Sequence, residues 1–256
     1  MRLLPAACAA GLFLVSCGGG QSPAPASSGP APAASSAPAS IDPATAAAVT
    51  GKITFEGTPP APQAVKLSAD PYCAGANPGL TTESGLVGPG GVVQNVFVYV
   101  KDGLNGRTFA APADPIVIDQ KGCHYTPHVI GIQVGQPLQI INSDATLHNV
   151  HGLAKTNKEF NAGQPIQGMK MTHTFSTVEV MVPFKCDVHA WMNAWVGVLD
   201  HPYYAVTGAD GTFSLKGLPP GTYTIEAWHE KFGSQTQMVT VSEKETKDVT
   251  FSFKGA

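Results

Sequence analysis

The fold of this chain is indicated most clearly by residues 134–152, which read VGQPLQIINSDATLHNVHG. Apolar and polar residues largely alternate in the first half, and a polar run of Asn, Ser and Asp follows. Alternation with a period of two is typical of a β-strand with one buried face, and a polar cluster after it is typical of a turn. The segment therefore predicts a strand and a turn, with His148 directly after the turn.

The same pattern extends in both directions from this segment. Short apolar runs bounded by Gly, Pro, Asn or Asp recur along the chain, among them VTGKITFEG, VVQNVFVYVKDG, PIVIDQ, VEVMVPFKC, AWVGVLD, GTFSLKGL, GTYTIEAWHE, TQMVTVS and KDVTFSF. No stretch shows a long apolar period of 3.6 residues, which a helical protein would require. Strands at this spacing predict an all-β fold built from sandwiches or barrels.

Composition agrees with this fold class and excludes some functions. The chain has 256 residues, of which 28 are Gly, 22 are Pro and only 13% are charged. This length is enough for one or two domains with hydrophobic cores. The net charge of −3 provides no basic surface for nucleic acid, so we expect no nucleic-acid partner.

The N-terminus predicts export. Residues 1–17, MRLLPAACAAGLFLVSC, combine one positive charge, an apolar stretch and small residues before a cysteine. They resemble a bacterial lipobox, which implies a signal peptide at 1–16 and acylation of Cys17; an ordinary signal peptide cleaved nearby is the alternative. The implied location is the periplasmic face of a bacterial membrane, the outer membrane being one option. Residues 17–47 are rich in Ala, Pro and Ser and predict a disordered linker, so only the lipid would contact the membrane.

Cysteine usage narrows the chemistry of the folded part. Without Cys17 and the signal peptide, the remaining cysteines are Cys73, Cys123 and Cys186. In an oxidising compartment two of the three are expected to pair. The simplest assignment is a Cys73–Cys123 disulfide with Cys186 as a free metal thiolate, and the other two pairings remain open.

The candidate metal residues lie in one short loop and one distant strand. Cys186, His189 and Met192 are spaced C-x-x-H-x-x-M, and His148 precedes them in the sequence HNV. A soft thiolate, two imidazoles and a weak thioether suit copper that cycles between Cu(I) and Cu(II). Zinc held by one cysteine and two histidines is an alternative, although a thioether offers zinc little.

These residues also have simpler interpretations. Cys186 could be an ordinary buried apolar residue, and Met192 could serve only core packing. His151, on the same segment as His148, is the main rival ligand. A second metal site at His124 and His128, beside Cys123, is a further alternative.

The order of the two motifs resembles that of the cupredoxins, the blue-copper electron carriers of the amicyanin and plastocyanin type. The resemblance implies a Greek-key sandwich over residues 111–200 and one type 1 copper ion. By this resemblance His148, Cys186 and His189 are the strong ligands and Met192 is the axial ligand.

The residues around the ligands also follow the cupredoxin pattern in part. The resemblance places Asn149 where its side chain holds the cysteine loop. Asp187 stands where Ser or Thr is usual, and Ala190 replaces a proline. An extra negative charge at Asp187 would stabilise Cu(II), so this departure affects the expected reduction potential more than the metal.

A second resemblance covers the C-terminal part. Residues 210–227, DGTFSLKGLPPGTYTIEA, resemble the carboxypeptidase regulatory-like domain, a small transthyretin-like sandwich. The first strands of that domain are missing here, but GKITFEGTPP and NVFVYVKDG fit them. We therefore expect residues 48–110 and 201–256 to form one discontinuous sandwich into which the cupredoxin is inserted. The alternative is an enlarged cupredoxin at 48–199 followed by a separate half-domain.

The expected function is that of a membrane-anchored periplasmic blue-copper protein that carries single electrons between redox proteins. The exit route would be a solvent-facing edge of His189, beside Ala190 and Trp191. Copper binding or delivery without electron transfer is one alternative, and a purely structural envelope sandwich is another. Enzyme activity is not expected, because four protein ligands leave no open metal position and no nucleophile–base pair is evident.

Overall fold

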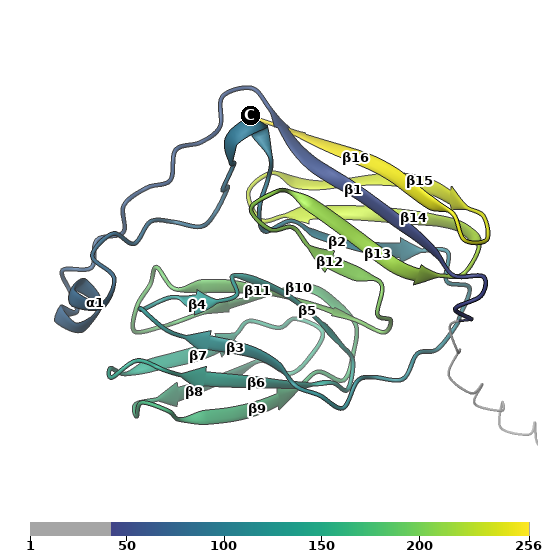
Figure 1. The fold of residues 1–256 in the computed structure, drawn as a ribbon. Coiled ribbons are helices and arrows are strands. Elements are labelled where there is room, and N and C mark those ends of the chain that lie inside the picture. The colour runs from purple at the N-terminus through teal and green to yellow at the C-terminus, as the bar shows by residue number, and fades with distance from the viewer. Residues whose placement is uncertain (1–41, 256) are drawn as a thin grey trace, which may run out of the picture. The chain divides into compact units, whose positions relative to one another are not determined.

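The computed structural model describes residues 42–255 and is shown in Figure 1. The signal peptide at 1–16, the lipidation site Cys17 and most of the linker at 17–47 lie outside the described residues. Within them, sixteen β-strands accompany one short α-helix and one 3-10 turn, so the all-β prediction is confirmed. No helix of the described part is long and apolar enough to cross a membrane.

One pair of sheets, which we call the first sandwich, consists of a three-stranded sheet in the order β13-β1-β16 and a four-stranded sheet in the order β12-β2-β14-β15. Its strands are β1 (Ala47–Glu56), β2 (Phe97–Asp102), β12 (Tyr204–Val206), β13 (Thr212–Leu218), β14 (Gly221–His229), β15 (Gly233–Val241) and β16 (Thr246–Lys254).

Strands from both ends of the described chain share the sheets of the first sandwich. β1 pairs antiparallel with β13 and parallel with β16, and β2 pairs antiparallel with β12 and β14. Val49 and Ile53 of β1 are buried in one core with Phe213 of β13 and Phe251 of β16. This pairing is what a discontinuous sandwich requires, and a separate C-terminal half-domain would lack it.

The intervening residues form what we call the second sandwich. Its sheets have the orders β5-β11-β10-β7-β8 and β4-β3-β6-β9. Its strands are β3 (Ile116–Gln120), β4 (Tyr125–Thr126), β5 (Val129–Gln133), β6 (Pro137–Asn142), β7 (His148–Gly152), β8 (Phe160–Gln164), β9 (Lys170–Thr174), β10 (Glu179–Lys185) and β11 (Asn193–Leu199).

Residues 134–152 cross from one sheet of the second sandwich to the other. β6 alternates between buried and half-buried residues, and β7 begins at His148, but the two strands lie in different sheets and do not form a hairpin. The buried Asn142 organises the connection, because its side-chain amide donates to the carbonyls of Thr146 and Gln164. The start of β7 is thereby fixed at one end of the sandwich.

A separate apolar cluster joins the two sandwiches. Phe97 and Tyr99 of β2 are buried with Val129, Met181 and Leu199 of the second sandwich. Glycine is required where the aromatic rings approach closely: a Cβ at Gly131 would lie 2.2 Å from Cε2 of Tyr204. The junction is therefore closely packed.

The connection from β1 towards β2 does not stay on the first sandwich. Residues 57–88, which we call the strap, run out to helix α1 (Pro71–Ala76) and return to the 3-10 turn η1 (Pro89–Gly91), as Figure 1 shows. Leu67 and Cys73 of the strap are buried in the core of the second sandwich. The sequence assigns all of residues 48–110 to the first sandwich. The strap is an exception, because it packs against the second sandwich.

Candidate metal centre

Three of the predicted ligands converge at one end of the second sandwich. His148 is the first residue of β7, Cys186 directly follows β10, and His189 lies in the loop before β11. The Nδ1 atoms of the two histidines are 2.9 Å apart, and the Sγ atom of Cys186 is 4.0 Å from Nδ1 of His189. The three side chains are buried, with exposed fractions of 0%, 2% and 3% in sequence order.

Met192 closes the loop that carries two of these ligands. Its backbone N–H donates to the carbonyl of His189, and its carbonyl accepts from the N–H of Cys186. The Met192 side chain is fully buried in the same core cluster as Cys186. The C-x-x-H-x-x-M segment is therefore a compact hydrogen-bonded loop between β10 and β11.

Each histidine is held by a carboxylate on the side away from the cluster. Nε2 of His148 lies 2.9 Å from Oδ2 of Asp144, and Nε2 of His189 lies 2.9 Å from Oδ2 of Asp70. Burial alone raises the pKa of both carboxyls, but hydrogen bonds from the histidines and from backbone N–H groups outweigh it and lower both pKa values below the usual range. An ionised carboxylate only accepts, so each Nε2 carries a proton and donates it.

This assignment leaves both Nδ1 atoms as the inward-facing groups, and two facing lone pairs require a proton or a cation between them. Burial alone lowers the pKa of His148, but Asp144 and Cys186 outweigh it and raise this pKa to about 9. Burial alone raises the pKa of the Cys186 thiol, but His148 and nearby N–H groups lower it. Two imidazole nitrogens and a thiolate fit copper, which would displace the proton.

Asn149 clamps the ligand loop from the neighbouring strand. Its Oδ1 atom accepts from the backbone N–H groups of Asp187, at 2.6 Å, and Val188, at 3.4 Å, and lies 3.3 Å from Sγ of Cys186. Its amide nitrogen donates to Asn161 and to the Asp187 carboxylate. Asn149 therefore lies beside the thiol and bonds across the loop.

Asp187 is surrounded by groups that offset its charge. Its carboxylate lies 2.8 Å from Nζ of Lys185, 3.0 Å from Nδ1 of His151 and 2.7 Å from Nδ2 of Asn161. The hydrogen bond from Lys185, followed by that from Asn161, lowers the pKa of Asp187 far below its usual range. The carboxylate is thus ionised but neutralised locally.

The alternative histidines do not join the cluster. His151 pairs with Asp187 and Glu159, and it belongs to none of the groups of metal-ligating atoms found within the described residues. His124 and His128 belong to none of these groups either. The nearby cysteines Cys73 and Cys123 form a disulfide, and Cys186 is the free cysteine of the described part.

The expected solvent-facing edge of His189 is absent, and that expectation is wrong. Asp70 and Cys73 of the strap cover the Nε2 atom, and Sγ of Cys73 is 3.8 Å away. Trp191 packs against the same ring and donates from Nε1 to the carbonyl of Cys123. The sequence could not show this cover, because the strap joins the site from more than a hundred residues away.

Asp70 and Asp144 are the functional residues that sequence reasoning missed. Asp144 lies four residues before His148 in the polar turn, and that spacing was the available signal. The sequence around Asp70 indicates only a helix N-cap before Pro71. In the structure the Asp70 side chain accepts from the N–H groups of Tyr72 and Cys73.

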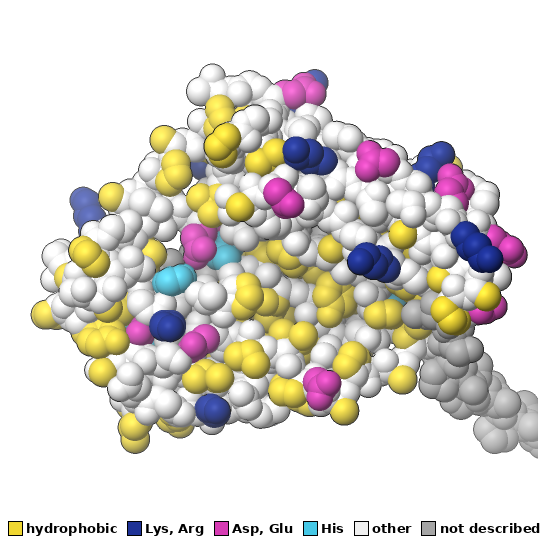
Figure 2. Space-filling view, in the orientation of Figure 1, with side chains coloured by type: hydrophobic (Ala, Val, Ile, Leu, Met, Phe, Trp, Pro, Cys, Tyr) yellow, Lys and Arg dark blue, Asp and Glu magenta, His cyan; other side chains and the backbone are white. Residues whose placement is uncertain are grey.

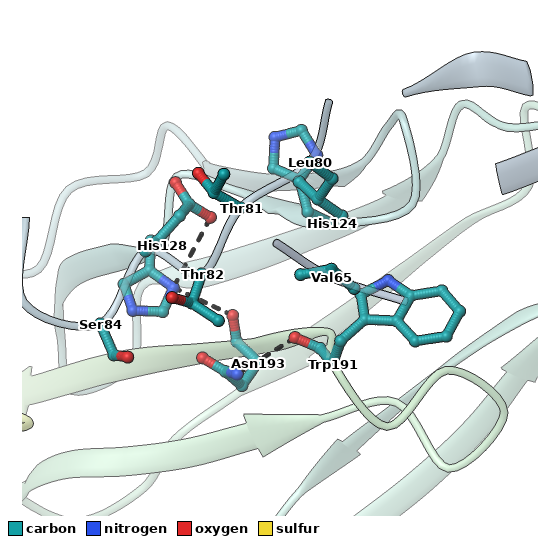
Figure 3. Close-up of a pocket in the computed structure, with 10 residues that line it drawn as sticks. Val65, Leu80, Thr81, Thr82, Ser84, His124, His128, Trp191 and Asn193 are labelled. Atoms are coloured by element: carbon teal, nitrogen blue, oxygen red, sulfur yellow. Dashed lines mark hydrogen bonds and ion pairs between the residues drawn. The ribbon is translucent and has the colours of Figure 1, made fainter. Parts of the chain in front are cut away.

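A small cavity of about 60 Å³ lies between the strap and the end of the ligand loop (Figure 3). It is lined by Val65 and Leu80 of the strap, by Trp191 and by His128. Nδ1 of His128 lies 3.1 Å from the carbonyl of Asn193. The cavity is large enough for a few water molecules at most.

Charges are dispersed around this region. On the face shown in Figure 2, Lys and Arg side chains occur singly among acidic and apolar ones. That face has no basic cluster of the kind that nucleic acid would require.

Comparison with known proteins gives one family match, which covers the C-terminal part of the chain. Residues 192–254 match the family model of the carboxypeptidase regulatory-like domain, which confirms the resemblance read from residues 210–227. The match begins at Met192, directly before β11 of the second sandwich. No curated protein matches the chain.

The solved structures similar to this chain include copper proteins. A Cu-containing nitrite reductase from Thermus scotoductus SA-01 is 19% identical over 38% of this chain and 25% of its own, with a TM-score of 0.33. A purple cupredoxin from Nitrosopumilus maritimus is 22% identical over 32% of this chain and 97% of its own, with a TM-score of 0.28. An amicyanin variant in its Cu(I) form is 25% identical over 40% of this chain and 97% of its own, with a TM-score of 0.30. This chain therefore spans about a quarter of the nitrite reductase.

Proposed function

We propose that the protein is a type 1 copper protein that carries single electrons. The observation that carries the proposal is the buried set of two Nδ1 atoms and one cysteine sulfur, each positioned by a neighbouring polar group. His148, Cys186 and His189 would hold copper as strong ligands, with Met192 as the weak axial ligand. Copper would supply the one-electron couple.

The described residues favour electron transfer because they are held in place from several sides. Carboxylates orient both imidazoles, and Asn149 holds the backbone beside the thiolate. A ligand set held in this way changes little between the two oxidation states, which keeps the reorganisation on electron transfer small. Ligand partners of this kind typically affect metal affinity by about 10-fold to 100-fold.

We also propose a lipid anchor at Cys17, a periplasmic location and redox proteins as partners. The proposal includes no catalytic activity, because His148, Cys186, His189 and Met192 would together complete the copper coordination. The anchor is tested by the mass of the membrane-extracted protein, which should include a diacylglycerol-modified Cys17.

The visible spectrum of the Cu(II)-loaded protein tests the copper site. We expect intense absorption from thiolate-to-copper charge transfer, with one copper bound per chain. Cys186→Ser and His148→Ala should abolish the band. The matched control is His151→Ala, which removes a nearby histidine outside the cluster and should keep it. A colourless protein that binds copper only as Cu(I) would reject the proposal.

The delivery alternative would draw on Met169, Met171 and His173, which alternate along one short segment, and this segment does not favour it. Met171 is half-buried against the core. The imidazole of His173 stacks on Phe160 and packs edge-on against Phe175. These two side chains are therefore packing residues, and Met169 alone is exposed.

A further inference from the structure

We propose that the strap is a working part of the metal centre: Asp70 is a positioning residue for His189, and the strap closes this edge of the site with the Cys73–Cys123 disulfide as its fastening. The inference rests on the proposed function of the site. It goes further, because it assigns access to the metal to a segment that belongs in sequence to the other sandwich.

Asp70 joins the strap to the ligand through one carboxylate. Oδ1 caps α1 by accepting from the N–H groups of Tyr72 and Cys73, at 2.8 Å and 3.2 Å. Oδ2 accepts from Nε2 of His189 and from Oγ1 of Thr146, at 2.9 Å and 3.1 Å. The orientation of the His189 ring therefore depends on the position of the helix that Asp70 caps.

The disulfide connects the two carboxylate–histidine pairs. Cys73 lies in the helix capped by Asp70, and its partner Cys123 donates a backbone N–H to Oδ2 of Asp144 at 2.8 Å. The same Oδ2 atom accepts from His148. A single covalent bond thus ties together the groups behind both histidines.

Further contacts hold the strap against the second sandwich. The Tyr72 hydroxyl donates to Oδ1 of Asp144 at 3.2 Å, and the Asn77 amide donates to the carbonyl of Gly122 at 3.2 Å. Leu67 is buried in the core of this sandwich. The strap is therefore held in place by apolar burial, hydrogen bonds and the disulfide, and the small cavity in Figure 3 lies between it and the ligand loop.

In consequence, the His189 side chain is not exposed to solvent. Reagents and metal acceptors would reach His189 only when the strap moves. A redox partner would exchange electrons with the copper through the protein shell, without touching this imidazole.

The first test uses the metal-free protein, so its outcome does not depend on copper. Diethyl pyrocarbonate labelling, mapped by mass spectrometry, measures the accessibility of His189, with the partly exposed His124 as internal reference. Asp70→Asn is the decisive variant, because Asn also caps helices well but offers its amide where His189 needs an acceptor. We expect His189 to be modified at least tenfold faster in this variant than in the wild type.

Two further variants complete the test. The double variant Cys73→Ser with Cys123→Ser should increase the rate of His189 labelling at least as much as Asp70→Asn. The matched control Glu83→Gln removes a strap carboxylate that lies beside His128, and it should label as the wild type does. If the cysteine variant does not fold, Asp70→Asn decides. Rapid labelling of His189 in the wild type, or equal rates in Asp70→Asn and the wild type, would overturn the proposal.

The second test measures copper release from the Cu(I)-loaded protein to a chelator. Release should be at least tenfold faster from Asp70→Asn than from the wild type and from Glu83→Gln. A normal charge-transfer band with unchanged release would overturn the inference and leave the proposed function standing. Absence of the band in the wild type would reject the proposed function, while the labelling test would still decide on the strap.

Discussion

The two sandwiches bury polar groups in different ways. In the first sandwich they are dispersed: Glu226 pairs with Tyr99 and Lys101, His201 bonds the carbonyl of Val100, and His229 accepts from backbone N–H groups. In the second sandwich, the buried polar groups at the start of β7 converge within a few ångströms, and carboxylates and an amide surround them.

The pKa values of the buried histidines also differ between the two sandwiches. Burial lowers the pKa of His201, and it lowers that of His229 to about 4, so both imidazoles are neutral and serve packing. The pKa of His148 moves in the opposite direction, because a carboxylate and a thiol share its surroundings. Buried ionisable groups that reinforce one another in this way are typical of functional sites.

The largest effect is expected where the two sandwiches meet. Gly131→Ala places a Cβ 2.2 Å from the ring of Tyr204 and 2.9 Å from that of Phe97. Forced repacking of this kind should lower the free energy of unfolding by about 3 kcal/mol. Denaturant unfolding measures it. Gly163→Ala is the control, because nothing lies within 4 Å of the added Cβ, and a loss as large there would refute the assignment of this junction.

The next largest effect is expected at Asn149, which holds the ligand loop of the second sandwich. Asn149→Ala leaves the N–H groups of Asp187 and Val188 without their acceptor and frees the loop beside Cys186. We expect a loss of about 2 kcal/mol in stability and a weaker charge-transfer band. Glu226→Gln, in the first sandwich, should leave the band unchanged. An unaltered band in Asn149→Ala would show that the loop does not need this clamp.

We expect the free energy of unfolding to depend on pH through His128, which lies between the two sandwiches. Burial alone lowers its pKa, but the hydrogen bond and charge of Glu230, together with the charge of Glu83, raise it above the ordinary value. His229 also faces this pair but is neutral. A raised pKa in the folded state stabilises the protein below the unfolded value near 6.5, and this contribution is lost as the pH rises through the raised pKa.

Unfolding measured across this pH window checks the prediction. Each unit by which the pKa is raised corresponds to about 1.4 kcal/mol. Glu230→Gln removes the main partner of His128, so its stability should depend less on pH than that of the wild type. A steeper dependence in the variant would contradict the prediction.

The smallest effect is expected at Asp187. Asp187→Asn removes a negative charge near copper, which should raise the reduction potential. Because Lys185 and His151 already offset the charge, we expect only a small positive shift. Redox titration measures the shift, and Glu159→Gln, which removes a carboxylate bonded only to the outer nitrogen of His151, should shift it less. A lower potential in Asp187→Asn would contradict the prediction.

Much of the fold could be predicted from the sequence, because β-strands are encoded by local alternation. The strand–turn–His148 order, the regulatory-like pattern at 210–227 and the C-x-x-H-x-x-M loop each lie within a few consecutive residues. A loop of seven residues can bring Cys186, His189 and Met192 together without help from distant segments. The sequence alone therefore determined the all-β class and the candidate ligands.

The surroundings of those ligands depend on contacts between segments that are distant in the sequence. Asp70 lies 119 residues from His189, and no local period marks such a contact. The strap leaves its own sandwich because burial of Leu67 and the Cys73–Cys123 bond stabilise it on the other one. Burial and hydrogen bonding depend on what is near in space, so the closed histidine edge and its two carboxylate partners emerge only once the chain is folded.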